Sequence, residues 1–204
     1  APRANEFRQV ALRLDSTLTA IDTLQLPYWK GPVFEIHRGG MSASYSVPFA
    51  PSLLWWLDPR GYIWSSITDR YRIVQQTLRG DTVRIVEREV EPVPVTAAEK
   101  DTGIARLGPF VQQGGVVDRS KIPDAKPPIT QFSLDDQGYL WTRRSRPENA
   151  SGTLFDVFDP EGRYLGEVLA PLSLQTVLIR GAALYAVASV DEVPVIVRFR
   201  IRGR

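Results

Sequence analysis

The chain has 204 residues, of which 43% are hydrophobic and 24% charged, and these proportions are typical of a globular protein with a sizeable core. Its 25 Lys and Arg against 23 Asp and Glu leave a net charge of only +2, so we expect no nucleic-acid partner, which normally requires a concentrated basic patch. Cysteine is absent, which excludes disulfides, thiolate metal sites and cysteine nucleophiles. No apolar run approaches the roughly 18 residues of a membrane span, and no signal peptide is visible.

Residues 7–26 are predicted to form a β-hairpin. Val10, Leu12 and Leu14 alternate with other side chains, and Asp15 opens a stretch with turn chemistry. The later segment 158–168 follows the same plan, with Asp159 in the place of Asp15. The chain therefore contains related hairpins far apart in the sequence.

A second pair of related segments covers residues 57–65 and 134–142. Both contain Leu, Asp, Gly, Tyr and Trp at the same places, and each is predicted to be a strand end, an Asp/Gly turn and a second strand. They belong to two sets of four strands, expected at 53–58, 61–67, 71–78 and 82–89, and at 130–135, 138–144, 153–159 and 163–169. A third, shorter set is expected at 176–180, 183–190 and 195–201.

The aromatic residues of these segments are expected to form a repeated structural core. Trp64 and Trp141 occupy equivalent places, Tyr62 and Tyr139 precede each by two residues on the same strand face, and Tyr185 takes the Trp position in the last set. A carbohydrate-binding aromatic platform is one interpretation of the pattern. Packing between neighbouring sheets is favoured, because large side chains fill the gap between twisted sheets.

Two stretches lie outside the repeats. In residues 90–128, Thr96 and Glu99 have capping-box spacing, which predicts one short helix near 97–107 with Gly108-Pro109 as its stop and ordered loop beyond it. Residues 27–50 are expected to contain a small extra hairpin. Loops on a rigid β scaffold are where function usually lies.

Four-stranded antiparallel sheets repeated along a chain are typical of a β-propeller. The Leu-Asp-x-x-Gly-Tyr-Ile/Leu-Trp turn, the Phe-Asp-Pro-Glu-Gly-Arg turn at 158–163 and the Pro-rich insertion resemble bacterial six-bladed β-propellers of the TolB-like/NHL-like group over residues 7–202. That resemblance implies an exported, extracytoplasmic (periplasmic or secreted) binding or scaffold protein.

The expected fold class is all-β: a single, partial β-propeller over residues 1–204, equivalent to the C-terminal portion of such a protein. About three to three and a half blades of an expected six are counted: an outer hairpin at 7–26, blades at 51–89 and 129–170, the insertion at 90–128, and a last blade at 175–202 that lacks its fourth strand. A closed four-bladed ring using residues 33–49 is the alternative. An open arc would expose edges through which chains could self-associate.

Basic side chains mark the candidate ligand-binding site. In a propeller the loops 27–50, 68–70, 90–128 and 143–150 would surround one mouth of the disc. Lys126, Arg143, Arg144 and Arg70 would make that mouth attractive to an anionic group of a protein, peptide or glycan ligand.

No catalytic or metal-ligating residues are assigned. His37 is the only histidine, so a Ser-His-Asp triad would have to use it; the neighbouring Ser42 lacks the Gly-x-Ser-x-Gly setting, and His37 is interpreted as a hairpin residue. Asp58, Asp135 and Asp136 recur at turns, where an Asp side chain caps its own backbone.

The leading function is therefore a non-enzymatic binding or scaffold module without a cofactor. One alternative is a calcium-dependent lactonase- or lyase-like propeller enzyme, by resemblance to the gluconolactonase- and paraoxonase-type propellers, which hold calcium on their axis. Another is a structural module of a longer protein.

Overall fold

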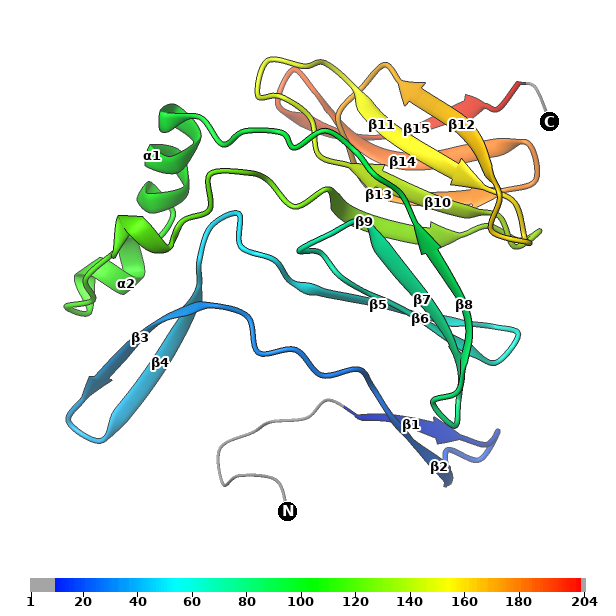
Figure 1. The fold of residues 1–204 in the computed structure, drawn as a ribbon, viewed down its shortest axis with the longest axis horizontal. Helices are drawn as coiled ribbons and strands as arrows, with labels where there is room; N and C mark the ends of the chain where they lie inside the picture. The colour runs from blue at the N-terminus through cyan, green and yellow to red at the C-terminus, as the bar shows by residue number, and fades with distance from the viewer. Residues whose placement is uncertain (1–9, 203–204) are drawn as a thin grey trace.

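The computed structural model describes residues 10–202, so the first three residues of the hairpin expected at 7–26 lie outside the described part. The described chain is mostly β, with fifteen strands and two α-helices (Figure 1). Every β-sheet is antiparallel and joins strands in sequence order, as in a series of hairpins. The all-β prediction is confirmed at this level.

The two predicted four-stranded sheets form close to their expected bounds. The first sheet contains β5 (Leu53–Asp58), β6 (Tyr62–Ile67), β7 (Arg72–Thr77) and β8 (Thr82–Glu87). The second sheet contains β9 (Ile129–Leu134), β10 (Leu140–Arg144), β11 (Thr153–Phe158) and β12 (Tyr164–Ala170). A third sheet of three strands follows, with β13 (Leu174–Arg180), β14 (Ala183–Val190) and β15 (Val193–Arg200).

Two separate hairpins precede the sheets in the chain. One is β1 (Val10–Leu14) with β2 (Ala20–Gln25), and the other is β3 (Val33–Arg38) with β4 (Met41–Ser46). Figure 1 places β1–β2 at one end of the row of sheets.

An aspartate builds the same turn at several hairpins. Oδ1 of Asp58, Asp135 and Asp159 accepts the N–H two residues on, and the backbone carbonyl of each accepts the N–H of the glycine three residues on. Each glycine has a positive φ of 85–91°, which favours a residue without a Cβ. Asp15 makes the same bonds, although Leu18 holds the left-handed position with φ 64°. The predicted capping role of Asp58 and Asp135 is therefore confirmed.

Asp136 does not share this role. Its Oδ1 accepts the backbone N–H of Gly181 at 2.9 Å, so it links the second sheet to the β13–β14 turn of the third. The prediction that it caps its own turn is wrong, because Asp135 already satisfies the turn's donors.

Two apolar cores join the three sheets. Trp64, Ile73 and Val86 of the first sheet pack with a set from the second: Ile129, Phe132, Leu140 and Phe158. Trp141 on the opposite face of the second sheet packs with residues of the third: Leu174, Ile179, Leu184, Ala186 and Ala188. Each Trp therefore faces the sheet that follows it in the chain.

Tyr185 faces the corresponding way, but no further sheet of the described chain packs on it, and the Arg198 guanidinium lies 5.8 Å from the centre of its ring. Its strand neighbours Leu184 and Ala186 are buried against the second sheet, so Tyr185 points to the opposite face. It is 38% exposed, against 3% for Trp64 and 1% for Trp141. The expectation that all three aromatics pack between sheets holds for the two Trp residues and is wrong for Tyr185.

The insertion contains more helix than expected. α1 (Ala97–Ala105) has the predicted capping box between Thr96 and Glu99. A second helix, α2 (Gly108–Gln112), and a 3₁₀ turn, η1 (Arg119–Lys121), follow it. The single-helix prediction is wrong because Pro109 does not stop a helix here. It lies in the first turn of α2, where a missing N–H costs nothing.

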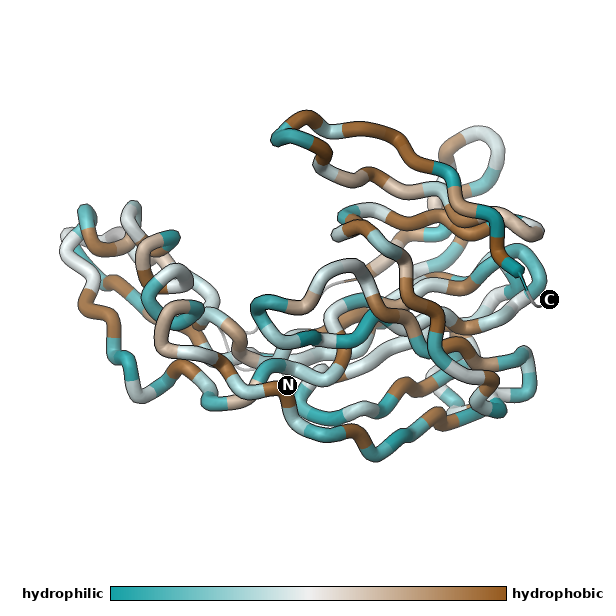
Figure 2. Tube along the Cα trace, turned by 90° about the horizontal axis from the view of Figure 1, so that it is seen from above, coloured by the Kyte–Doolittle hydropathy of each residue, from teal (hydrophilic) through white to brown (hydrophobic). Residues whose placement is uncertain are grey.

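The helices and the β3–β4 hairpin form a lobe with its own small core. Phe110 of α2 packs against Phe34 with ring centroids 5.7 Å apart and against Tyr45 at 5.3 Å. The lobe projects away from the sheets in Figures 1 and 2. Segments 27–50 and 90–128, both outside the repeats, thus come together in space.

Candidate functional site

A cavity of about 550 Å³ lies where loops from the lobe and from the second sheet meet. We call it the basic cavity. Thirteen residues line it: Phe49, Ser52, Thr68, Lys126, Pro127, Ile129, Thr130, Arg143, Arg144, Ser145, Arg146, Gly152 and Thr153. Four of these are cations and none is a carboxylate. Three of the four predicted site residues (Lys126, Arg143 and Arg144) therefore lie around one cavity.

Two of the cations are neutralised within the chain. Nζ of Lys126 is paired with Glu99, which is the N3 residue of the α1 capping box, and both side chains are nearly buried. The Arg144 guanidinium donates to Glu167 at 2.8 Å. The pairing with Lys126 and the bonds to Thr96 lower the pKa of Glu99 against the opposing effect of burial, so Glu99 stays charged at neutral pH.

Arg146 has a different partner. Its Nη1 donates to the backbone carbonyl of Ser151 within the same loop. That bond satisfies one donor of the guanidinium and leaves its charge without a carboxylate among the described residues.

Arg143 is the cation without a partner. Its guanidinium makes no ion pair or hydrogen bond to any residue between 10 and 202, and only its backbone carbonyl is used, by Thr130. Partial burial alone lowers the pKa of Arg143, since no nearby negative charge stabilises the cation. An anion placed beside a half-buried cation of this kind stabilises it, because the cation has lost part of its hydration.

Most hydroxyl donors of the cavity are already used by the backbone. Three of its five hydroxyl side chains donate to carbonyls: Ser145 to Pro127 at 2.6 Å, Thr153 to Leu172 at 3.0 Å and Thr130 to Arg143 at 3.4 Å. Phe49 and Pro127 add apolar surface to the wall, and Ile129 lies beneath it, fully buried. Arg143 is therefore the main free donor of the basic cavity.

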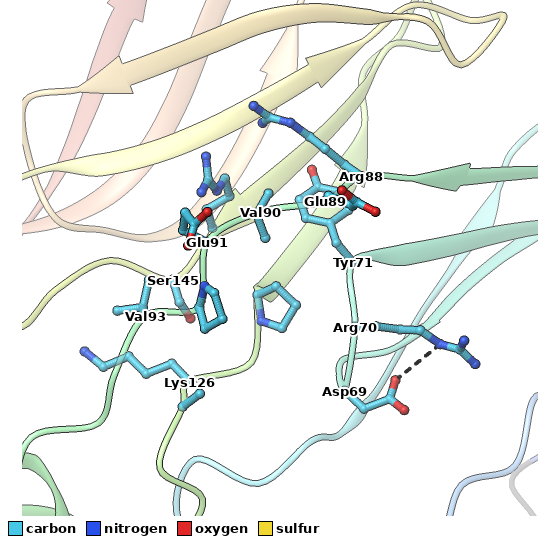
Figure 3. A pocket seen from close by; sticks show the side chains of 14 residues that line it. Asp69, Arg70, Tyr71, Arg88, Glu89, Val90, Glu91, Val93, Lys126 and Ser145 are labelled. Carbon is cyan, nitrogen blue, oxygen red and sulfur yellow. Dashed lines mark ion pairs between the residues drawn. The ribbon is translucent and has the colours of Figure 1, made fainter.

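A larger cavity of about 810 Å³ lies next to it, beneath the extended segment 89–93 (Figure 3). It shares Lys126, Arg144 and Ser145 with the basic cavity, and its other lining residues include both signs of charge. Arg70 lines this cavity and not the basic one; its Nε lies 3.9 Å from Asp69. In Figure 3 Arg70 and Lys126 lie on opposite sides of the cavity, so the structure does not bring Arg70 to the other three predicted residues.

An ionic network centred on a buried carboxylate joins the first two sheets and includes Arg88 and Arg144 of the larger cavity's lining. Asp156 on β11 is fully buried and is paired with Arg88, which follows β8. Arg144 bridges Asp156 and Glu167, with N–O distances of 3.9 and 2.8 Å. Arg144 thus belongs both to the cavity walls and to this network, which holds its side chain in place.

Aromatic hydroxyls surround the same carboxylate. The Tyr164 hydroxyl lies 3.4 Å from Asp156 Oδ1, and the Arg88 guanidinium lies 4.1 Å from the centre of the Tyr164 ring. Burial and the Asp156 charge raise the pKa of Tyr71, which stays neutral at physiological pH. Sequence reasoning missed this network because Arg88 and Asp156 lie 68 residues apart and neither belongs to a motif.

The structure also brings His37 and Ser42 together. The two residues face each other across the β3–β4 hairpin, with 3.1 Å between Nδ1 and Oγ, and Glu35 lies 3.5 Å from the other ring nitrogen. The three residues are those of a Ser-His-acid triad, but the ring nitrogens are exchanged, since in such a triad Nε2 faces the serine and Nδ1 the acid. The imidazole and carboxylate are mostly exposed (69% and 50% of each side chain), however, so their interaction is weakened by solvent and salt. The pairing of His37 with Ser42 in the β3–β4 hairpin is enough to explain their contact, so the contact does not support a catalytic role.

No group of three or more His, Asp or Glu side chains is placed to hold a metal ion within residues 10–202. Among those residues, no helix has the length and apolar character needed to cross a bilayer. A scan against protein-family models gives no match, and a search among curated proteins gives no significant match.

Proposed function

We propose that this protein is a non-enzymatic binding module that recognises an anionic group of its ligand in the basic cavity. The observation that carries the proposal is the lining: four cations, no carboxylate, and Arg143 without a partner in the described chain. Partly buried cations attract and orient anions more strongly than fully exposed charges do.

The proposal includes the architecture of a β-propeller similar to the six-bladed TolB-like/NHL-like group. It is supported by two four-stranded sheets with one turn design, each packed on the next through one Trp. The first strands of the two sheets, β5 and β9, also contact each other, as expected when sheets radiate from a common axis. An extracytoplasmic location, implied by the same resemblance, is part of the proposal.

The direct test is anion binding by the chain and by an Arg143→Gln variant. We expect the unaltered chain to bind small anions, with binding that weakens as salt is raised, and the variant to lose at least about tenfold in affinity, because a charge-assisted hydrogen bond contributes ~1.5–3 kcal/mol. Arg79→Gln is the matched control, since Arg79 lies in the exposed β7–β8 turn. Equal anion binding by all three proteins would refute the proposal.

Calcium analysis separates this function from the enzyme alternative. One tightly held calcium per chain, retained through gel filtration, would favour the lactonase- or lyase-like alternative. The binding module needs no metal for its anion site.

A further inference from the structure

We propose, on the basis of the proposed function, that the ligand group held in the basic cavity is a single carboxylate flanked by an apolar side chain, as at the C-terminus of a peptide that ends in an apolar residue. Such capture of a chain end is a recurrent mode of peptide recognition. The inference depends on three features of the cavity: its charge, its free donors and its apolar wall.

Charge determines how many negative charges the cavity accepts. Lys126 and Arg144 are neutralised by Glu99 and Glu167, and the Arg146 guanidinium is turned onto a backbone carbonyl. Arg143 alone has neither an ion pair nor a side-chain hydrogen bond within the described chain. Arg143 is thus the cation whose charge and donors are both free for one negative charge, whereas a doubly charged phosphate would also need Arg146, whose guanidinium keeps its charge but is engaged by the Ser151 carbonyl.

The geometry of the donors favours a planar anion. A guanidinium presents parallel N–H groups that match the two oxygens of a carboxylate. The additional oxygens of phosphate or sulfate would need further donors, but three of the five lining hydroxyls already donate to backbone carbonyls. A carboxylate is therefore the anion whose acceptors Arg143 can satisfy alone.

The apolar part of the lining determines what is attached to the carboxylate. Phe49 and Pro127 give the cavity an apolar side, and burying a Leu-sized side chain against it favours binding. A sugar acid would place hydroxyls against the same wall and leave them without partners, which is costly. The volume of about 550 Å³ is in the range of small-ligand sites and accommodates a terminal residue.

The path of the remaining peptide follows from the shared walls. Lys126, Arg144 and Ser145 connect the basic cavity to the cavity under residues 89–93. A chain whose end is held by Arg143 can therefore extend into the neighbouring cavity, which is open and lined by both signs of charge (Figure 3). A free small acid would leave that second cavity unused.

Calorimetry on the whole chain at low salt tests the inference. The probes are acetyl-Gly-Ala-Leu with a free carboxylate, the same peptide as its C-terminal amide, acetyl-Gly-Ala-Gly acid, glucuronate, acetate, inorganic phosphate and inorganic sulfate. We expect the Leu acid to bind most tightly, the amide and the Gly acid each to lose about tenfold or more, and acetate, phosphate, sulfate and glucuronate to bind more weakly. Arg143→Gln should abolish the difference between acid and amide, whereas Arg79→Gln, in the exposed β7–β8 turn, should keep it.

The acid–amide comparison uses the unaltered chain, so it remains informative even if a variant folds poorly. Tighter binding of phosphate, sulfate or glucuronate than of the Leu acid, with loss in Arg143→Gln, would overturn the inference and leave the proposed function standing. If acetate binds as tightly as the Leu acid, the inference is also overturned and the proposed function stands, because the apolar wall would then contribute nothing to binding. If no probe binds, or if Arg143→Gln changes nothing, both the inference and the proposed function are wrong.

Discussion

The carboxylate of Asp156, fully buried on β11, is paired with the guanidinium of Arg88, which lies just beyond β8 of the preceding sheet. This pair joins two sheets that also meet through an apolar core. Arg144 approaches the same carboxylate from the adjacent strand and also lines the basic cavity. The packing of the sheets and the position of a cavity wall are therefore coupled through one buried charge.

Removing the Asp156 carboxylate should destabilise the protein strongly. Asp156→Ala leaves Arg88 without its main partner in a partly buried place, and breaking such a pair typically costs ~3–5 kcal/mol. Urea unfolding at pH 7 measures the loss, with Glu161→Ala as control because Glu161 is exposed and its one ion pair within residues 10–202 is with exposed Arg163. The double variant Arg88→Met/Asp156→Leu should recover most of the loss. A loss below about 1 kcal/mol for Asp156→Ala would show that the pair is not desolvated.

The three aromatics of the repeat should differ in their effect on stability. Trp64→Ala and Trp141→Ala each empty a filled space between sheets and should cost ~3–5 kcal/mol in the free energy of unfolding. Tyr185→Ala removes a ring that is 38% exposed and should cost roughly 1 kcal/mol or less. Equal losses at all three positions would mean that the Tyr185 face is covered in solution.

Local patterns were enough to predict most of the strands, because alternation and Asp/Gly turns act within a few residues. Asp58, Asp135 and Asp159 determine their turns through bonds to residues two and three positions on, and these bonds are visible in the sequence spacing. The burial of Tyr185 could not be predicted in this way. It depends on which sheet lies opposite, and that is a property of tertiary packing.

The candidate site was likewise predictable only as far as local sequence determines it. A run of basic residues around Arg143 was visible in the sequence, but the sequence does not tell which cation is neutralised. Glu99 and Glu167, which neutralise Lys126 and Arg144, lie more than twenty residues away from them along the chain. The second helix was missed because Pro109 is compatible with both a helix stop and a helix start.

Glycine at position 152 should be less replaceable than glycine at position 61. Both have a positive φ (81° and 86°), so Ala is strained at either place and costs about 1 kcal/mol. At Gly61 a new Cβ meets open space, whereas at Gly152 it would collide with the backbone carbonyl of Ala170 on β12. Gly152→Ala should therefore cost at least ~1–2 kcal/mol more than Gly61→Ala, because the β11–β12 pairing must shift. Thermal unfolding of the two variants measures the difference. Equal midpoints would contradict the close approach of position 152 to the Ala170 carbonyl.

Acid should destabilise the protein in a definite pH window. Burial acts to raise the pKa of Asp58, but the Arg60 guanidinium and backbone N–H outweigh it and leave the pKa below its ordinary value of 3.8. Glu99 behaves alike: burial is outweighed by Lys126 and Thr96, and its pKa lies below the ordinary 4.5. With folded pKa values below the unfolded ones, the unfolded chain binds more protons in acid, so stability rises with pH through this range. The stabilisation that these two carboxylates contribute is fully present above their pKa values in the unfolded chain. It is lost as the pH falls through their lower pKa values in the folded protein.

The urea midpoint should accordingly change little between pH 7 and about pH 5 and fall steadily below about pH 4.5. Glu99→Gln cannot ionise, so it should be less stable than the unaltered chain at pH 7 and lose less on acidification. Arg60→Gln should show the same convergence, because Asp58 then keeps its burial but loses its main counter-charge. Asp22→Asn is the matched control, since Asp22 is exposed and forms no ion pair with residues 10–202. Parallel pH profiles for the unaltered chain and both test variants would place the acid sensitivity in other carboxylates.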